Sequence, residues 1–218
     1  MNNRIILLLL LLILLLLLIV LLLLNNKEKF TIYDPEYDRK KPESDTESYK
    51  ESDKKTETNY YGLTKNLGEI NNDRNLTIRT SIIGPELKSN PSGLFNWVIS
   101  NKSNTIHGYS NAMWSGLTTI ELSNFIIWSL DNGTTGIVHA TNNLGISKFN
   151  LIKLINNVFD LKIKIIKNKD YEIDKTLLNT KINDYLFPSY FKMIKEMKVW
   201  IDKDNIYTKI NYNETKRT

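Results

Sequence analysis

The pattern of apolar and polar residues divides the chain into distinct parts. Residues 5–24 are entirely Leu, Ile and Val, residues 25–59 are polar and charged, and apolar residues at helical or strand spacing return from Tyr60. A helix of 20 residues is about 30 Å long, which matches the hydrocarbon core of a bilayer. We therefore predict a transmembrane anchor at 1–24, a polar tether at 25–58, a folded domain at 59–202 and a loose tail at 203–218.

The apolar run Ile5–Leu24 predicts a single-pass N-terminal membrane anchor that stays on the chain. It ends in Leu24-Asn25-Asn26-Lys27, without the small-residue pattern at which a signal peptide is cleaved. A cleaved signal peptide and a low-complexity leucine tract remain the alternatives. Cationic residues lie on both sides of the run, so the side of the membrane that holds the domain is not determined.

The tether is rich in Glu, Asp, Lys, Ser and Thr and contains Pro35 and Pro42. No apolar period runs through it, so it cannot bury enough apolar surface to offset its conformational entropy. We expect Lys40–Thr58 to be mobile.

Helical and strand patterns alternate from Tyr60 onward, which predicts an α/β domain. The β-branched run Leu76–Ile83 predicts a strand that ends at Gly84-Pro85. Ser147 is the expected N-cap of a helix at Lys148–Phe159. The other predicted elements are helices at Tyr61–Asn71, Ser92–Ser100, Thr118–Leu130 and Tyr190–Ile201, and strands at Gly136–Ala140 and Leu161–Ile166.

Composition excludes several classes of function. The net charge is +5, but the cations are spread thinly without an Arg-rich block, which argues against nucleic acid as a partner. The absence of Cys excludes disulfides, thiolate catalysis and Cys-ligated metals. His107 and His139 are the only histidines, so we predict no metal site.

Tyr61 and Lys65 form a Tyr-x-x-x-Lys pair whose side chains share one face of a helix. A nearby ammonium lowers the pKa of a phenol, which can then exchange a proton with a carbonyl or alcohol oxygen while hydride moves at the carbon. The motif alone is weak, because the chain contains four matches. This pair alone opens a predicted helix that leads into an apolar strand.

Two segments around this pair resemble the extended short-chain dehydrogenase/reductases. They are Tyr61-Gly-Leu-Thr-Lys65-Asn-Leu-Gly-Glu69 and Leu76-Thr-Ile-Arg79-Thr-Ser-Ile-Ile-Gly84-Pro-Glu86. The likeness is closest to the dTDP-4-dehydrorhamnose reductase group, which acts on 4-keto-6-deoxy sugar nucleotides. It continues in order to Ile201 through Gly93-Leu-Phe-Asn-Trp97, His107-Gly-Tyr-Ser-Asn111-Ala-Met-Trp-Ser-Gly116-Leu-Thr-Thr-Ile-Glu121-Leu, Gly136-Ile-Val-His139, Ile146-Ser147-Lys148, Asp174-Lys-Thr-Leu177, Pro188-Ser189 and Met193-Ile-Lys-Glu-Met197.

The resemblance implies roles for individual residues. Tyr61 and Lys65 correspond to the family's catalytic pair, and NAD(P)H is the family's cofactor. The residues that the resemblance places near the nucleotide sugar are Arg79, His107, Tyr109, Asn111 and Lys175. A salt bridge at a strand end explains Arg79 equally well, and a solvated surface is the default environment for Lys175. We expect His139, within an apolar strand, to be a hydrogen-bonded core histidine.

The family's Rossmann half opens with a Gly-x-x-Gly-x-x-Gly loop that lets the pyrophosphate approach the backbone. The first glycine of this chain is Gly62, so no such loop precedes Tyr61. The resemblance therefore covers the substrate-binding lobe and a Rossmann remnant made of the Tyr/Lys helix and one parallel strand. We expect the isolated chain to bind no cofactor.

These observations leave three functional hypotheses. The first is a membrane-anchored, truncated sugar-nucleotide reductase-like protein without independent catalysis. The second is an active NAD(P)H-dependent reductase that a separate dinucleotide-binding chain completes. The third is a scaffold that holds a sugar-nucleotide enzyme at the membrane. The expected partners are the lipid bilayer, a nucleotide sugar, and either a second copy or a fuller reductase chain. A gene remnant with little function also stays open.

Overall fold

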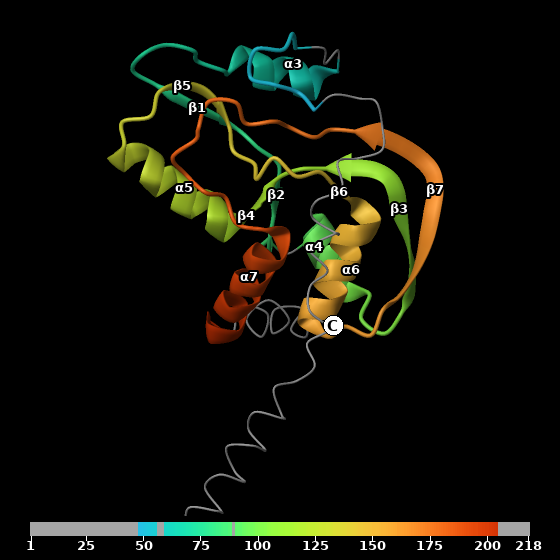
Figure 1. Ribbon diagram of the computed structural model, residues 1–218. Helices are drawn as coiled ribbons and strands as arrows, with labels where there is room; N and C mark the ends of the chain where they lie inside the picture. The colour runs from blue at the N-terminus through green and yellow to red at the C-terminus, as the bar shows by residue number, and fades with distance from the viewer. Residues whose placement is uncertain (1–47, 56–58, 89, 205–218) are drawn as a thin grey trace, which may run out of the picture. The chain divides into compact units, whose positions relative to one another are not determined.

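The computed structural model describes residues 48–55, 59–88 and 90–204 (Figure 1). The predicted anchor Ile5–Leu24, residues 25–47 of the tether and residues 205–218 of the tail lie outside this range. Within it, no helix has the length and apolar character needed to cross a membrane.

The fold is α/β, with mainly parallel strand pairing in three small sheets. β1 (Leu76–Arg79) pairs with β5 (Gly136–His139), and β2 (Ile82–Ile83) pairs with β4 (Leu117–Thr118), both in parallel. In the third sheet, β3 (Thr105–Trp114) pairs in parallel with β7 (Lys164–Asp174) and antiparallel with β6 (Ile146–Ser147). The helices are α3 (Tyr60–Leu67), α4 (Leu94–Ser100), α5 (Thr119–Asp131), α6 (Lys148–Phe159) and α7 (Tyr190–Asp204).

The core lies between α4, α6 and α7 and the inner face of the β3–β7 ribbon. Phe95, Leu151 and Met197 are fully buried there. Figure 1 shows α6 against the concave side of the long, curved pair of strands. Gly108 permits this approach, because a Cβ atom at that position would lie 3.0 Å from the Cα atom of Phe149 on α6. Ser147 caps α6 as predicted, and its Oγ accepts from the amide of Asn150.

Helix α3 is shorter than the predicted Tyr61–Asn71. It begins after Asn59, whose Oδ1 accepts from the amide of Gly62 at 2.8 Å, and its last helical residue is Leu67. The next residues form a turn in which Asn72 Oδ1 accepts from the amides of Arg74 and Asn75. The helix itself ends at Gly68, whose amide donates to Thr64 O and Lys65 O, before this turn begins.

The predicted strand Leu76–Ile83 is divided between two sheets. The chain changes partner after Arg79, where Thr80 Oγ1 donates to Ala140 O at 2.8 Å and Ser81 O accepts from the amide of Leu117 at 2.9 Å. β3 was not predicted as a strand, and β7 is longer and later than the predicted Leu161–Ile166. Both strands carry many polar residues, and their backbone pairing with each other stabilises them beyond what side-chain pattern indicates.

Residues 48–53, which we call the strap, lie against the folded domain although the sequence assigns them to the tether. The amide of Tyr49 donates to Thr176 O at 2.9 Å, and the amide of Leu178 donates to Tyr49 O at 2.8 Å. Glu51 is only 7% exposed. The strap is therefore part of the ordered domain.

Candidate functional site

Tyr61 and Lys65 share one face of α3, as the spacing predicts. The Lys65 Nζ lies 5.5 Å from the centroid of the Tyr61 ring, within the range of a cation–π contact. The ring of Tyr61 is 75% exposed, and no residue of α3 is buried. Within the described domain the pair is thus on an open helix surface.

Arg79 lies at the carboxyl end of β1 and makes the salt bridge that one of the two interpretations predicted. Its Nε and Nη2 donate to the two carboxylate oxygens of Glu69 at 2.8 and 2.9 Å. Its Nη1 reaches Glu51 O at 3.4 Å and His139 Nε2 at 3.3 Å. Hydrogen bonding from Arg79, supported by Lys55, lowers the pKa of Glu69 to about 2. In this arrangement all three nitrogens of the guanidinium have protein partners.

His107, Tyr109 and Asn111 come together on the outer face of β3. Ile106 and Gly108 are buried against the core, so the alternating residues His107 and Tyr109 point outward. From Tyr109 to Asn111 β3 advances two residues while β7 advances from Asn168 to Glu172, so the extra residues lie on β7 and Asn111 keeps the face of Tyr109, with Ala112 buried behind it.

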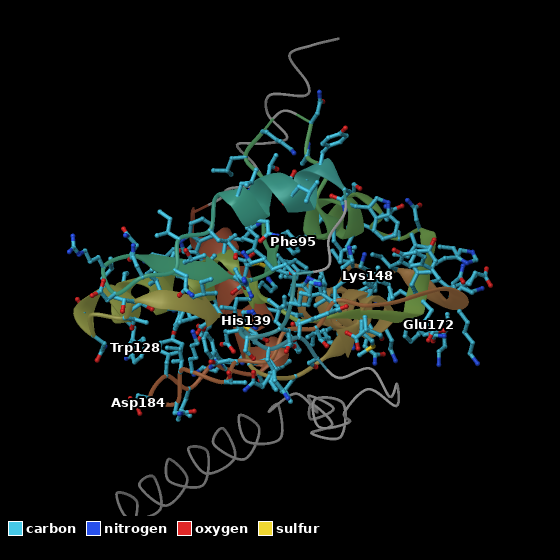
Figure 2. All side chains as sticks on the ribbon, turned by 90° about the horizontal axis from the view of Figure 1, so that it is seen from above. Phe95, Trp128, His139, Lys148, Glu172 and Asp184 are labelled. Atoms are coloured by element: carbon cyan, nitrogen blue, oxygen red, sulfur yellow. The ribbon has the colours of Figure 1, made fainter. Side chains whose placement is uncertain are left out.

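The neighbouring strand adds residues that the sequence did not indicate. The Tyr171 ring lies 5.4 Å from the Tyr109 ring, and Asn111 pairs with Glu172. Figure 2 shows Glu172 at the edge of the domain, away from His139 near its middle. The outer face of the ribbon therefore combines an imidazole, an aromatic pair, an amide and a carboxylate, which suits hydroxyl and amide groups of a ligand.

Lys175 directly follows β7 and is exposed. Its amide donates to Met113 O at 3.4 Å, which extends the pairing of β3 with β7. The seven predicted site residues thus fall in three places: the α3 pair, Arg79 at the end of β1, and the β3 face with Lys175 at the end of β7.

A buried polar cluster that the sequence did not reveal surrounds Arg79. The Glu51 carboxylate accepts from the amide of His139 at 3.0 Å, from the amide of Thr180 at 3.2 Å and from Thr180 Oγ1 at 2.6 Å. Burial raises the pKa of Glu51, but these hydrogen bonds outweigh it and the net pKa is lowered. His139, 1% exposed, is the hydrogen-bonded core histidine that was predicted. Glu51 gave no signal because it lies in a uniformly polar stretch.

The described residues contain no group of three or more His, Asp or Glu side chains arranged to hold a metal ion.

Solved structures share this fold. dTDP-4-dehydrorhamnose reductase from Bacillus anthracis, solved in complex with NADP, matches 70% of this chain and 59% of its own, with 17% identity and a TM-score of 0.56. For the dTDP-4-dehydrorhamnose reductase from Clostridium acetobutylicum, the match covers 72% of this chain and 61% of the enzyme, with 14% identity and a TM-score of 0.54. No protein-family model matches the sequence, and the comparison with curated proteins gives no match.

The chain therefore shares the fold of these two dTDP-4-dehydrorhamnose reductases. It spans about three fifths of the length of these two enzymes.

Proposed function

We propose that this chain is a membrane-anchored, sugar-nucleotide reductase-like protein that binds a nucleotide sugar and does not transfer hydride by itself. The main support for the lack of hydride transfer is the exposure of α3. Hydride transfer needs a nicotinamide held in a site that excludes water, whereas Tyr61 and Lys65 lie on a helix without a buried residue. The absence of a Gly-x-x-Gly-x-x-Gly loop in all 218 residues supports the same proposal.

The outer face of β3 is the proposed contact surface for the nucleotide sugar. Tyr109 and Tyr171 offer exposed ring faces for a base or a sugar, and His107 and Asn111 offer hydrogen-bonding groups on the same side. Lys175 is the nearby cation proposed for phosphate. Arg79 is excluded from that role here because Glu69 already holds its guanidinium.

The test is a titration of the full chain in detergent micelles with NADPH and, separately, with dTDP-glucose. We expect no saturable NADPH binding up to millimolar concentration, and dTDP-glucose binding that Tyr109→Ala weakens at least tenfold. Tyr60→Ala is the matched control, because Tyr60 is an exposed tyrosine on α3, outside the proposed surface. Saturable micromolar NADPH binding by a monomer would contradict the proposed lack of catalysis. Equal loss in both tyrosine variants would contradict the proposed surface.

A second candidate is favoured by the apolar surface that the described domain leaves exposed. Leu67 on α3 is 87% exposed and Ile82 on β2 is 57% exposed, and Ile127 and Leu130 on α5 are exposed as well. β1 pairs only with β5 among the described strands, and a two-stranded sheet is marginal by itself. A separate dinucleotide-binding chain that adds strands beside β1 would cover these groups and supply the cofactor site.

The DNA upstream of Met1 distinguishes the two candidates cheaply. A neighbouring reading frame that encodes a Gly-x-x-Gly-x-x-Gly loop after a strand pattern would favour completion by a second chain. Co-expression of both frames should then give a complex that oxidises NADPH in the presence of a 4-keto-6-deoxy sugar nucleotide. An inactive or absent complex would leave the non-catalytic function.

A further inference from the structure

The strap crosses the carboxyl ends of two parallel strands. Arg79 is the last residue of β1 and His139 the last of β5, and Glu51 of the strap contacts both. The strap also bonds to the segment after β7, through Tyr49 to Thr176 and Leu178 and through Glu51 to Thr180. Glu51 therefore joins three separate parts of the domain: its carboxylate binds His139 and Thr180, and its backbone carbonyl accepts from Arg79.

His139 is neutral in this arrangement. Its Nδ1 lies 3.0 Å from Leu178 O, which can only accept, so Nδ1 carries the proton. Its Nε2 lies 3.3 Å from Arg79 Nη1, which can only donate, so Nε2 is unprotonated. A second proton on the ring would point at a guanidinium.

Charged groups contact the ring or the residues around it. The strap supplies Glu51, β1 supplies Arg79, and the end of α3 supplies Glu69, which also binds Lys55 at 2.5 Å. Lys181 donates to Ile137 O at 2.8 Å, two residues before the histidine. Burial is the largest effect on the pKa of His139 and lowers it. The charge of Glu51 and hydrogen bonds to the backbone of Leu178 and Tyr49 raise it, Arg79 lowers it, and the net pKa is lowered.

We propose that Glu51, His139 and Arg79 form a latch that holds the strap at neutral pH and releases it on acidification. When His139 gains its second proton, Nε2 loses its lone pair and two cations meet. Arg79 then withdraws toward Glu69, the contact of Arg79 with Glu51 O is lost, and the strap leaves the strand ends.

The direction of the pH effect follows from proton linkage. A histidine whose pKa is lowered in the docked state binds fewer protons there than in the released state, so docking weakens as the pH falls below 6.5. The loss is at most about tenfold per pH unit for one proton. Glu51, whose pKa is also lowered when docked, adds to the release in the same direction below pH 4.5.

Release would lengthen the connection between the domain and residues 1–47. The six residues of the strap, 48–53, span at most about 22 Å when fully extended. With the proposed anchor in place, acidification would let the domain move farther from the bilayer. This consequence rests on the proposed anchor, whereas the latch does not depend on it or on nucleotide-sugar binding.

The chain has no Cys, so Ser52→Cys gives a single site for a spin label on an exposed strap residue. The experiment follows the mobility of this label in the full chain by electron paramagnetic resonance from pH 7.5 to pH 5. We expect an immobilised label at pH 7.5 and a mobile fraction that rises at least fivefold by pH 5, while the circular dichroism spectrum of the domain is unchanged.

The two histidines supply matched variants. His139→Asn keeps a donor for Leu178 O but cannot titrate, so the label should stay immobilised to pH 5. His107→Asn, on the exposed face of β3, should leave the transition unaltered. Glu51→Gln should mobilise the label already at pH 7.5, and this variant remains informative if the core substitution prevents folding. Three outcomes would each overturn the proposal. The label could stay immobilised to pH 5 with the latch residues unsubstituted, the transition could persist in His139→Asn, or the strap could stay docked in Glu51→Gln.

Discussion

The ion pair between Glu69 and Arg79 fastens the end of α3 to β1. Both side chains are largely buried, at 16% and 19% exposure, and the guanidinium binds both carboxylate oxygens. A pair of this geometry is stronger than an exposed salt bridge, because two charge-assisted hydrogen bonds form in a partly desolvated place. It orients the helix that carries Tyr61 and Lys65.

We predict that Glu69→Gln lowers the free energy of unfolding by about 2 kcal/mol at pH 7. The fall of the Glu69 pKa from 4.5 to about 2 sets an upper bound of about 3.4 kcal/mol. Since the pKa is depressed in the folded state, this stabilisation is present above pH 4.5 and is lost as the pH falls toward 2. Urea denaturation of the full chain in micelles measures it.

Glu172→Gln is the control for that measurement, because Glu172 is an exposed carboxylate on β7. We expect a change within about 0.5 kcal/mol for an exposed residue of this kind. Equal losses in the two variants, or a loss in Glu69→Gln that is as large at pH 2.5 as at pH 7, would show that the ion pair is not the cause.

Individual residues differ in how far the sequence could place them. His139 was predictable because an apolar strand surrounds it, and Ser147 because it precedes an amphipathic helix. Arg79 allowed two interpretations, since its partner Glu69 is ten positions away and could not be distinguished from other acidic residues. Glu51 was not predictable at all, because its partners His139 and Thr180 lie 88 and 129 positions away.

Among the elements, β4 begins beside a glycine that permits close packing of two backbones. A Cβ atom on Gly116 would lie 2.2 Å from Ser81 O and 2.5 Å from the Trp114 ring. Gly116 therefore allows β2 and β4 to pair directly after the chain leaves β1.

We predict that Gly116→Ala destabilises the domain by about 3 kcal/mol or more, because a methyl group there forces the backbone of Ser81 to move. Gly68→Ala is the control, since the nearest atoms to its Cβ would be 3.6 Å away at an ordinary φ of −82°. That variant should be neutral or slightly stabilising, by up to about 1 kcal/mol. Thermal unfolding compares the two, and similar melting temperatures would contradict the packing argument.

Helices were easier to predict than strands in this chain. α5, α6 and α7 have apolar faces at helical spacing and N-caps or Pro-Ser starts, so their bounds agree with prediction to within a few residues. β3 carries His107, Gly108, Tyr109, Ser110 and Asn111, which form no alternating apolar pattern. Its pairing with β7 is nonlocal, and single-strand patterns do not encode nonlocal pairing.

At the scale of the whole molecule, the alternation of helical and strand patterns predicted the α/β class, and an ordered series of short likenesses predicted the finer fold within it. The solved reductase structures confirm the fold that this series implies. Neither the sequence likenesses nor the described part of the structure includes the predicted anchor. The anchor therefore stays a prediction.

We predict that the full chain remains in the membrane fraction after carbonate extraction. Each Leu or Ile at the centre of a spanning helix favours insertion by about 0.3–0.6 kcal/mol, and Ile5–Leu24 contains no polar residue. The double variant Leu14→Arg, Leu15→Arg adds about 5–7 kcal/mol of insertion cost and should release the chain. Extraction of the intact unsubstituted chain would show that the run is not an anchor.

The last prediction concerns the exposed apolar surface on α3 and β2. Leu67 on α3 and Ile82 on β2 are both exposed, and exposed apolar side chains and strand edges favour association. In the absence of a second chain, we expect the full protein to self-associate in micelles at micromolar concentration, as measured by sedimentation velocity. Leu67→Lys should shift it toward the monomer without a loss of stability, because the side chain is already exposed. Leu186→Lys is the control, since Leu186 is 91% exposed on the segment before α7 and should leave the assembly unchanged. A monomer at these concentrations, or association that neither lysine alters, would show that this surface does not mediate self-association.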